Sequence, residues 1–336
     1  MNERSYKKVF IFFAVFTLAV IVFLLLAHNR YSFFTSKGGG WSIGYRFIED
    51  PLRKVEPMGS QVLDLEWLDR KTDQKTIFLA DPFVIHERDT FFVFFEHQGV
   101  GNANIGLLQS HDGYNFIYKG EVLDEKFHLS FPNVFKYQED FYMLPETKQA
   151  GHILLYKAED FPYNWKIYDT LITNVHLKDP ALLMTDSLKV ISASDHNLKQ
   201  HLFTSKSLEG PWVKDPAFQD RQGDQTRAGG NFFKVNNSWY LPFQKNNDGY
   251  GTGLALYQFI VEENQKKFVK VSDSFLESSD SIVWFNRGMH HLSLIKVKDH
   301  FYTVFDGDVK DTLAPKLTSW KASLKYNYYD LINLFR

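Results

Sequence analysis

The sequence predicts an all-β protein, a five-bladed β-propeller preceded by one N-terminal transmembrane helix. Three observations support this fold class: an uncharged apolar run near the N-terminus, short β-branched and aromatic runs over the rest of the chain, and a hairpin pattern that occurs five times. The 336 residues are 44% hydrophobic and 17% aromatic, so the chain can bury a large core.

Charge and cysteine content exclude some classes of function. The 38 Lys and Arg residues against 40 Asp and Glu residues give a net charge of −2, and no basic block is long enough to indicate nucleic-acid binding. The chain has no cysteine, which excludes disulfides, thiolate zinc sites and cysteine nucleophiles. We expect neither a nucleic-acid partner nor a cofactor.

The apolar run VFIFFAVFTLAVIVFLLLA, residues 9–27, predicts a membrane span. As a helix it would extend about 28 Å, close to the hydrocarbon thickness of a bilayer. A cleaved signal peptide is the alternative, but the run is longer than the usual apolar core of such peptides, and Leu25 before Ala27 makes a poor cleavage site. We therefore expect a retained signal-anchor.

The charges beside this run predict its orientation. Arg4, Lys7 and Lys8 precede the run, which favours a cytoplasmic N-terminus over residues 1–8. The bulk of this single-pass membrane protein would then lie on the non-cytoplasmic side. Residues 28–40 are predicted to be a linker, flexible at Lys37-Gly38-Gly39-Gly40.

Residues 41–336 predict the propeller and a C-terminal tail, because one pattern of strand, polar turn and strand recurs. A propeller needs such repeats, since each blade is one four-stranded sheet that cannot bury both faces alone. A two-sheet sandwich is the alternative, but it would not produce a repeat near fifty residues. The copies start 50, 48, 50 and 62 residues apart, at residues 81–96, 131–146, 179–194, 229–244 and 291–306.

The two ends of a hairpin lie side by side, so equivalent ends of all five blades should meet around one mouth. Acids, a histidine and a glutamine at these ends predict a polar pocket on the axis. The alternative is structural, because such side chains also cap strand ends or bind neighbouring backbone amides. The first positions are Asp81, Phe131, Asp179, Gly229 and His291, and the last positions are Glu96, Glu146, Ser194, Gln244 and Asp306.

Several motifs carry a family resemblance. Asp81-Pro82, Asp179-Pro180, QSHDGYNF and SKSLEGPW resemble the five-bladed propellers of glycoside hydrolase family 43 and its relatives. More closely, ADPFVI, SHDGYNFIYKGEVLDEKFHLSFPNVFKY, YMLPET and KSLEGPW resemble the N-terminal domain of glucosamine inositolphosphorylceramide transferases and its bacterial relatives. The resemblance covers about residues 41–310 and is most specific over residues 110–147.

The resemblance to the hydrolases implies catalytic roles. In those enzymes an aspartate on the first blade is the general base, an aspartate on the third tunes acidity and orientation, and a glutamate on the fourth protonates the leaving oxygen. Asp81 and Asp179 match the first two positions. The fourth blade reads TRAGGNFF, with Arg227 near the position that the acid needs, so Glu146 or Glu96 would have to supply the proton.

Arg227 also indicates a different chemistry. An arginine beside carboxylates can bind a phosphate or a uronate bidentately, which suits a nucleotide sugar or a lipid phosphate. Glycosyl transfer with a phosphate leaving group needs only a base and charge stabilisation, roles that Asp81 and Arg227 could fill. The structural alternative is an ion pair between Arg227 and Asp224 or another acid at the rim.

The remaining candidates are binding residues. His291, Gln244 and Asp306 are expected to bind substrate, and Trp284 is the best candidate for stacking on a sugar ring. His128, His290 and His291 lack metal-ligand spacing, so we expect hydrogen-bonding or structural histidines and no catalytic metal. DGYGTG, residues 248–253, precedes a strand rather than a helix, so it predicts a turn and not a phosphate-binding loop.

These observations predict a membrane-anchored, carbohydrate-active propeller that takes part in glycosyl transfer to a glycan or glycolipid. A glycoside hydrolase with a displaced general acid and a non-catalytic glycan-binding module are the alternatives, because fold alone does not separate them. In the related family the propeller can precede a transferase domain. No such domain follows within this sequence, which favours the binding-module alternative, and a separate transferase partner is a further expectation.

Overall fold

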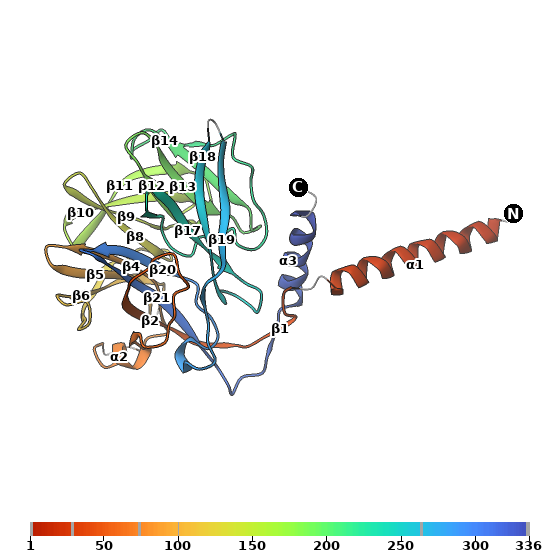
Figure 1. Cartoon of the computed structure of the whole chain (residues 1–336), viewed down its shortest axis with the longest axis horizontal. Coiled ribbons are helices and arrows are strands. Elements are labelled where there is room, and N and C mark those ends of the chain that lie inside the picture. Colours follow the sequence, from red (N-terminus) through yellow and green to blue (C-terminus); the bar gives the residue numbers. More distant parts are fainter. Residues whose placement is uncertain (1–2, 28–29, 73–74, 100, 263–264, 334–336) are drawn as a thin grey trace.

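The computed structural model describes residues 3–27, 30–72, 75–99, 101–262 and 265–333. Five four-stranded antiparallel sheets surround one axis, and a long N-terminal helix extends away from them (Figure 1). The five-bladed propeller predicted from the sequence is therefore confirmed. Each predicted hairpin forms the two innermost strands of one blade.

The first three blades each consist of four consecutive strands. Blade 1 contains β4 (Phe78–Glu87), β5 (Thr90–Gln98), β6 (Asn104–Ser110) and β7 (Ile117–Leu123). Blade 2 contains β8 (Ser130–Tyr137), β9 (Asp140–Glu146), β10 (His152–Asp160) and β11 (Tyr163–Thr173). Blade 3 contains β12 (Lys178–Met184), β13 (Lys189–Ser194), β14 (Gln200–Ser205) and β15 (Val213–Lys214).

The last two blades close the ring. Blade 4 contains β16 (Phe233–Val235), β17 (Ser238–Lys245), β18 (Gly253–Glu262) and β19 (Gln265–Glu277). Blade 5 takes β20 (Leu292–Val297) and β21 (His300–Lys310) from the C-terminal part, and β2 (Gly38–Ile48) and β3 (Gln61–Leu63) from the N-terminal part. Pairing of β21 with β2 joins both ends of the propeller in one sheet.

This closure corrects the predicted linker. Gly38, Gly39 and Gly40 lie at the start of β2, where Gly38 pairs with Lys310. The glycines therefore form a strand rather than a flexible link, because the edge of β21 offers them backbone partners. Before them, β1 (Phe34–Thr35) pairs with β22 (Leu317–Thr318).

Packing between blades explains the strand sequences. β5 and β13 near the axis are buried along almost their whole length, whereas the outer strand β7 alternates between more and less exposed residues. A strand that is covered on both faces needs a continuous apolar run, and a half-covered strand needs alternation. Phe94 of blade 1, for example, shares a core cluster with Met143 and Tyr156 of blade 2.

The two long helices, α1 (Glu3–Ala27) and α3 (Trp320–Asn333), lie outside the propeller (Figure 1). α1 includes a stretch, Ser5–Phe23, that is long and apolar enough to cross a membrane, with a mean hydropathy of 2.1. It overlaps the predicted span at residues 9–27. The predicted tail contains α3 (Trp320–Asn333), whose polar and aromatic sequence gave no helical signal. The short elements are α2 (Leu65–Asp69), η1 (Lys148–Ala150) and η2 (Val283–Phe285).

Candidate functional site

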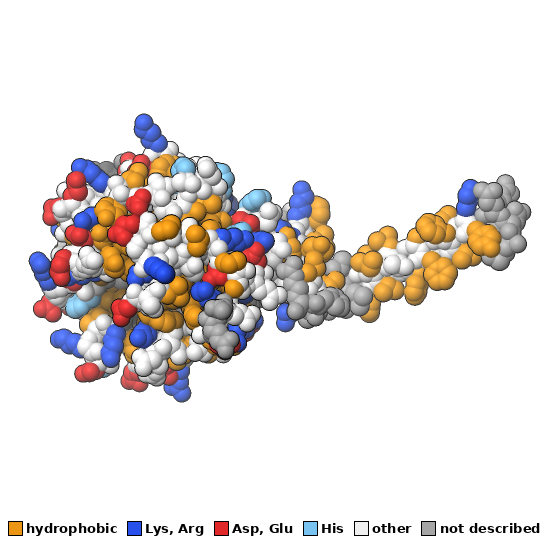
Figure 2. Space-filling model, turned by 90° about the horizontal axis from the view of Figure 1, so that it is seen from above, with side chains coloured by type: hydrophobic (Ala, Val, Ile, Leu, Met, Phe, Trp, Pro, Cys, Tyr) orange, Lys and Arg blue, Asp and Glu red, His pale blue; other side chains and the backbone are white. Residues whose placement is uncertain are grey.

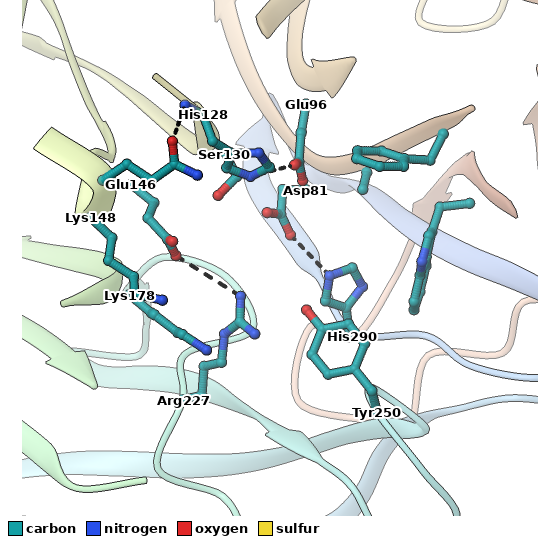
Figure 3. A pocket seen from close by; sticks show the side chains of 14 residues that line it. Asp81, Glu96, His128, Ser130, Glu146, Lys148, Lys178, Arg227, Tyr250 and His290 are labelled. Carbon is teal, nitrogen blue, oxygen red and sulfur yellow. Dashed lines mark hydrogen bonds and ion pairs between the residues drawn. The ribbon is translucent and has the colours of Figure 1, made fainter. Parts of the chain in front are cut away.

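A polar pocket of about 390 Å³ lies where the inner ends of the blades meet. Figure 3 shows acidic, basic and aromatic side chains pointing into it from several blades. Three of the four residues predicted as catalytic, Asp81, Glu96 and Glu146, line it together with Arg227, and the fourth, Asp179, is fully buried. The other lining residues are Trp41, Phe78, Ala80, His128, Ser130, Lys148, Gln149, Lys178, Tyr250 and His290.

A shared backbone feature positions the first residue of three blades. Asp81, Phe131 and Asp179 have φ angles of 49°, 50° and 48°, in the left-handed region, and each lies at a register shift between the two inner strands. This conformation is costly for a residue with a Cβ, so the surroundings must hold it in place. The equivalent backbone turns explain why these residues leave the strand and face the axis.

Carboxylates at the axis hold these turns from the neighbouring blade. The amide of Asp81 donates to Asp306 Oδ2 at 3.1 Å, and the amide of Phe131 donates to Asp81 Oδ2 at 3.1 Å. The amide of Asp179 donates to Glu146 Oε2 at 3.2 Å. The structural role considered for these acids is therefore real, and each of these bonds joins two adjacent blades.

Asp81 retains one oxygen for chemistry. Its Oδ1 is buried without a hydrogen bond and lies 3.3 Å from His290 Nε2. Burial raises the pKa of Asp81 well above its usual value, and the negative charges of Glu96, Asp179 and Asp306 act in the same direction. The positive charge of Arg227 opposes this shift, and the ionised form of a carboxyl group with a raised pKa is a strong proton acceptor, which suits a general base.

Asp179 forms a two-point ion pair with Arg227, whose Nε and Nη2 both donate to the carboxylate. Gln244 Nε2 donates to the same carboxylate at 3.2 Å. Burial alone would raise the pKa of Asp179, but the Arg227 guanidinium holds it below its usual value. Arg227 thus pairs with Asp179 rather than with Asp224, which accepts a hydrogen bond from Asn246 at 2.9 Å.

Glu146 lies beside this ion pair, but its pKa is raised whereas the pKa of Asp179 is lowered. Arg227 Nη2 is 4.0 Å from Glu146 Oε2. Burial and the charge of Asp179 raise the pKa of Glu146 to about 8, although Arg227 opposes the shift. At neutral pH Glu146 therefore carries a proton that it can donate, while Asp179 is ionised.

Cations occupy one side of the pocket. Lys148 lies two residues after Glu146, and Lys178 immediately precedes Asp179. Both lysines therefore lie next to a hairpin end identified in the sequence, and both line the pocket. Burial, with the positive charge of Arg227, lowers the pKa of Lys178. On another blade, Glu96 lies 3.0 Å from His128 Nε2, and this hydrogen bond raises the pKa of His128.

Aromatic side chains from blades 4 and 5 form another wall. The rings of Trp41 and His290 have centroids 4.1 Å apart, and Tyr250 lies 5.2 Å from His290. Tyr250 comes from the turn predicted at residues 248–253, which joins β17 to β18. The turn requires glycine at position 251 for two reasons. The φ of Gly251 is +65°, and a Cβ there would lie only 2.7 Å from the Cβ of His290, so glycine lets the turn pack against His290.

Trp284, predicted to stack on a sugar, lies outside this pocket. It belongs to η2 and packs against Phe285, with their ring centroids 3.2 Å apart. The indole ring of Trp284 also borders Gly44 of β2, so Trp284 packs against blade 5. Trp41, Phe78 and Tyr250 are aromatic residues that line the pocket, and sequence reasoning missed all three because none occupies a hairpin end.

Three other predicted binding residues lie beneath the pocket. His291, Gln244 and Asp306 are each at most 1% exposed. His291 packs between Phe83 and Phe131, and burial lowers its pKa to about 3. Burial corrects the expectation that these residues contact substrate directly, because they instead support residues that do line the pocket.

One group of side chains has the composition of a cation site. Ligand atoms of Asp81, His290 and Asp306 all lie within 4.8 Å of one another, and all three residues are buried. His290 Nδ1 is 2.9 Å from Asp306 Oδ2 and His290 Nε2 is 3.3 Å from Asp81 Oδ1, so the imidazole ring bridges the two carboxyl groups. His128 is not part of this group, since its partner is Glu96.

Comparison with known proteins identifies relatives by sequence. The family model described as "Glucosamine inositolphosphorylceramide transferase 1, N-terminal" matches residues 36–308. Proteins named glucosamine inositolphosphorylceramide transferase 1 from Oryza sativa subsp. japonica and Arabidopsis thaliana are each 30% identical, over 80% of this chain. The chain spans 40% and 39% of these two relatives, about two fifths of their length.

Solved structures share the fold at low sequence identity. The catalytic domain of a GH62 α-L-arabinofuranosidase from Coprinopsis cinerea is 14% identical, with a TM-score of 0.55 over 83% of this chain and 94% of that domain. A GH32 β-fructofuranosidase from Bombyx mori is 13% identical, with a TM-score of 0.52 over 70% of this chain and 56% of that protein. At these identities the similarity establishes the propeller architecture only.

Proposed function

Because this chain belongs to the family defined by the N-terminal region of glucosamine inositolphosphorylceramide transferase 1, we propose that its propeller takes part in glycosyl transfer to a phosphate-bearing glycan or glycolipid. Membership supports a carbohydrate-related role. The activity itself is a proposal, since this chain spans only about two fifths of the length of the named relatives.

The observation that carries the proposal is the convergence of Arg227, Lys148 and Lys178 with Asp81 and Glu146 in one pocket. Cations at short range favour an anionic group, and a guanidinium with a second cation is a common phosphate-binding combination. The two carboxyl groups supply a proton acceptor and a proton donor. This combination suits a sugar linked to phosphate better than a neutral polysaccharide.

Each residue has a role in this scheme. Lys148, Lys178 and the outer edge of Arg227 would hold the phosphate, and Trp41 and Tyr250 would pack against a sugar face. Asp81 would accept the proton of the attacking hydroxyl through its free Oδ1, with His290 orienting that oxygen. The sugar–phosphate bond breaks as the new glycosidic bond forms, and the phosphate leaves as an anion.

Hydrolysis is the second candidate, and one observation favours it. The raised pKa of Glu146, about 8, provides the protonated carboxyl group that a glycosidase needs for its leaving oxygen. Under this alternative Glu146 replaces the acid that the fourth blade lacks. A water molecule, rather than a sugar hydroxyl, would then lose its proton to Asp81.

The membrane setting is part of the proposal. With α1 retained as a single-pass anchor and residues 1–8 in the cytoplasm, the propeller lies on the non-cytoplasmic side, close to lipid-linked substrates. A transferase domain on a separate chain would be one partner for this propeller. Wild-type function would then require both chains.

The test measures binding and turnover for the full chain in detergent or lipid nanodiscs. Candidate nucleotide sugars and phosphorylated glycolipids are supplied with and without a neutral oligosaccharide, and both sugar transfer and sugar release are recorded. Asp81→Asn should lower turnover by about two to four orders of magnitude with little change in binding. Lys178→Gln should weaken binding of phosphate-bearing ligands.

Lys119→Gln is the matched control, because Lys119 is an exposed lysine on the outer strand β7 of blade 1. It should leave binding and turnover unchanged. Phosphate-independent binding in wild type and Lys178→Gln would reject the phosphate site. Unchanged turnover in Asp81→Asn would reject the proposed base, and ligand binding without any turnover would assign the propeller a binding role.

A further inference from the structure

An exposed apolar stripe runs along α3. Trp320, Leu324 and Tyr328 are four residues apart, so they lie on one face of the helix, and they are 51%, 40% and 56% exposed. The adjacent face of the helix carries the buried residues Ser323 and Asn327, so the exposed apolar side chains border the side of α3 that packs against the rest of the protein. We call Trp320, Leu324 and Tyr328 the outer stripe. Large apolar side chains aligned in this way on a surface usually have a binding partner.

The inner face of α3 is fixed to the segment that follows α1. Ser323 Oγ donates to the carbonyl of Tyr31 at 2.6 Å, and the amide of Arg30 donates to Asn327 Oδ1 at 3.1 Å. Tyr31 also donates to Asp330 at 3.2 Å. These bonds hold α3 against the chain only three residues beyond the end of α1 at Ala27.

This attachment limits the distance between α3 and the apolar helix. Three residues span at most about 10 Å, so Arg30 lies within that distance of the end of α1. α1 and α3 contact each other, and the C-terminal end of α1 lies beside α3 in Figure 1. Figure 2 shows hydrophobic side chains along α1 and on the neighbouring α3, at the edge of the propeller.

We propose that α3 is a second membrane contact, with its outer stripe lying in the interfacial region of the bilayer that α1 crosses. Tryptophan and tyrosine are enriched at this depth because their rings are apolar and their polar groups can reach water. Short amphipathic helices bind the same region with the apolar face inward and lysines toward the headgroups. Lys316 and Lys321 are exposed beside the stripe and complement anionic lipids.

Docking of α3 would fix the orientation of the propeller. Asn333 Nδ2 donates to the carbonyl of Gln222 at 2.8 Å, and Lys325 Nζ donates to the carbonyl of His196 at 3.1 Å. α3 therefore contacts both the loop that leads to Arg227 of the pocket and the turn between β13 and β14. A helix held at the headgroups would keep the pocket rim at the membrane surface, whatever chemistry the pocket performs.

The absence of cysteine makes a labelling experiment free of background. Leu324→Cys and Tyr328→Cys are prepared in the full chain, labelled with a nitroxide and reconstituted into vesicles of phosphatidylcholine and phosphatidylserine. Val213→Cys is the matched control, because Val213 is 55% exposed on the outer strand β15. Collision rates with oxygen and with a water-soluble nickel chelate are compared, and each variant must melt at the temperature of the unlabelled chain.

The expected result is an oxygen-to-nickel accessibility ratio several-fold higher at positions 324 and 328 than at position 213. Equal ratios at all three positions in vesicles would overturn the proposal. Strong dipolar coupling between labels at position 324 in lipid-rich vesicles would also overturn it, because a second copy of the chain would then cover the stripe.

Discussion

Replacing Glu146 by glutamine should make folding stability less sensitive to alkaline pH. Glu146 has a pKa of about 8 in the folded protein against an ordinary value of 4.5, chiefly because it is buried. Between these two pH values the unfolded chain has released the proton that the folded chain retains. Wild-type stability therefore falls as pH rises through this window, and the loss is complete only above the folded pKa.

The size of the effect follows from the shift. One pKa unit corresponds to about 1.4 kcal/mol, so a shift from 4.5 to about 8 has an upper limit of about 5 kcal/mol. Glutamine keeps the acceptor oxygen for the amide of Asp179 and has no proton to lose. Glu146→Gln should thus match wild type near pH 4 and exceed its free energy of unfolding by a few kcal/mol near pH 9.

The difference in unfolding free energy between wild type and Glu146→Gln is measured by urea unfolding of the detergent-solubilised full chain. Unfolding is followed by tryptophan fluorescence over this pH range. Glu121→Gln is the control of opposite sign, because hydrogen bonds from His97 and Asn104 lower the pKa of Glu121. That variant should lose stability at neutral pH and approach wild type in acid. Parallel pH profiles for wild type and Glu146→Gln would refute the assignment of the raised pKa to Glu146.

Three further predictions concern other contacts. Arg227→Met leaves Asp179 buried without its cation and should lower the free energy of unfolding by about 3 kcal/mol. Adding Asp179→Asn to the same chain should recover part of this loss, and full stability of Arg227→Met would contradict the ion pair. Gly251→Ala should destabilise the protein by more than about 1 kcal/mol and weaken ligand binding, because its Cβ would contact His290. Gly59→Ala is the control, since Gly59 also has a positive φ (+76°) but no neighbour within 4 Å, so only the backbone strain should destabilise this variant. Equal effects of the two variants on ligand binding would contradict the contact with His290. After carbonate washing of membranes the protein should stay in the pellet, and recovery of a soluble product beginning near residue 28 would show that the N-terminal segment is cleaved.

The sequence was sufficient for the fold because the inner strands repeat. Each blade has to place a hairpin at the axis, and the spacing of hairpins such as residues 81–96 and 131–146 is visible without any structure. Closure of blade 5 was harder to see. β2 begins with three glycines, which have no strand propensity, and it becomes a strand only because the edge of β21 lies beside it.

The same reasoning predicted part of the pocket and missed the rest. Asp81, Glu96 and Glu146 line it because they end inner strands, where register fixes position. Tyr250 and Trp41 reach it from a loop and from the closing strand, and no repeat marks either residue. The positions of Lys148 and Lys178 are predictable from the sequence, since each lysine lies within two residues of a hairpin end. The repeat pattern considers only the hairpin ends themselves, so it leaves these two lysines out of the predicted site.

The acids at the axis cannot be divided into structural and chemical residues. Asp81 uses Oδ2 to hold the left-handed turn of Phe131, which leaves only Oδ1 facing His290. Glu146 holds Asp179 in the same way, and that contact brings it close to Arg227. The bonds that join the blades therefore also fix the orientation of each carboxyl group beside the pocket. A substitution that keeps the acceptor, such as Asp81→Asn or Glu146→Gln, separates the two roles, whereas alanine at either position would remove both and could not distinguish a lost catalyst from a lost blade contact.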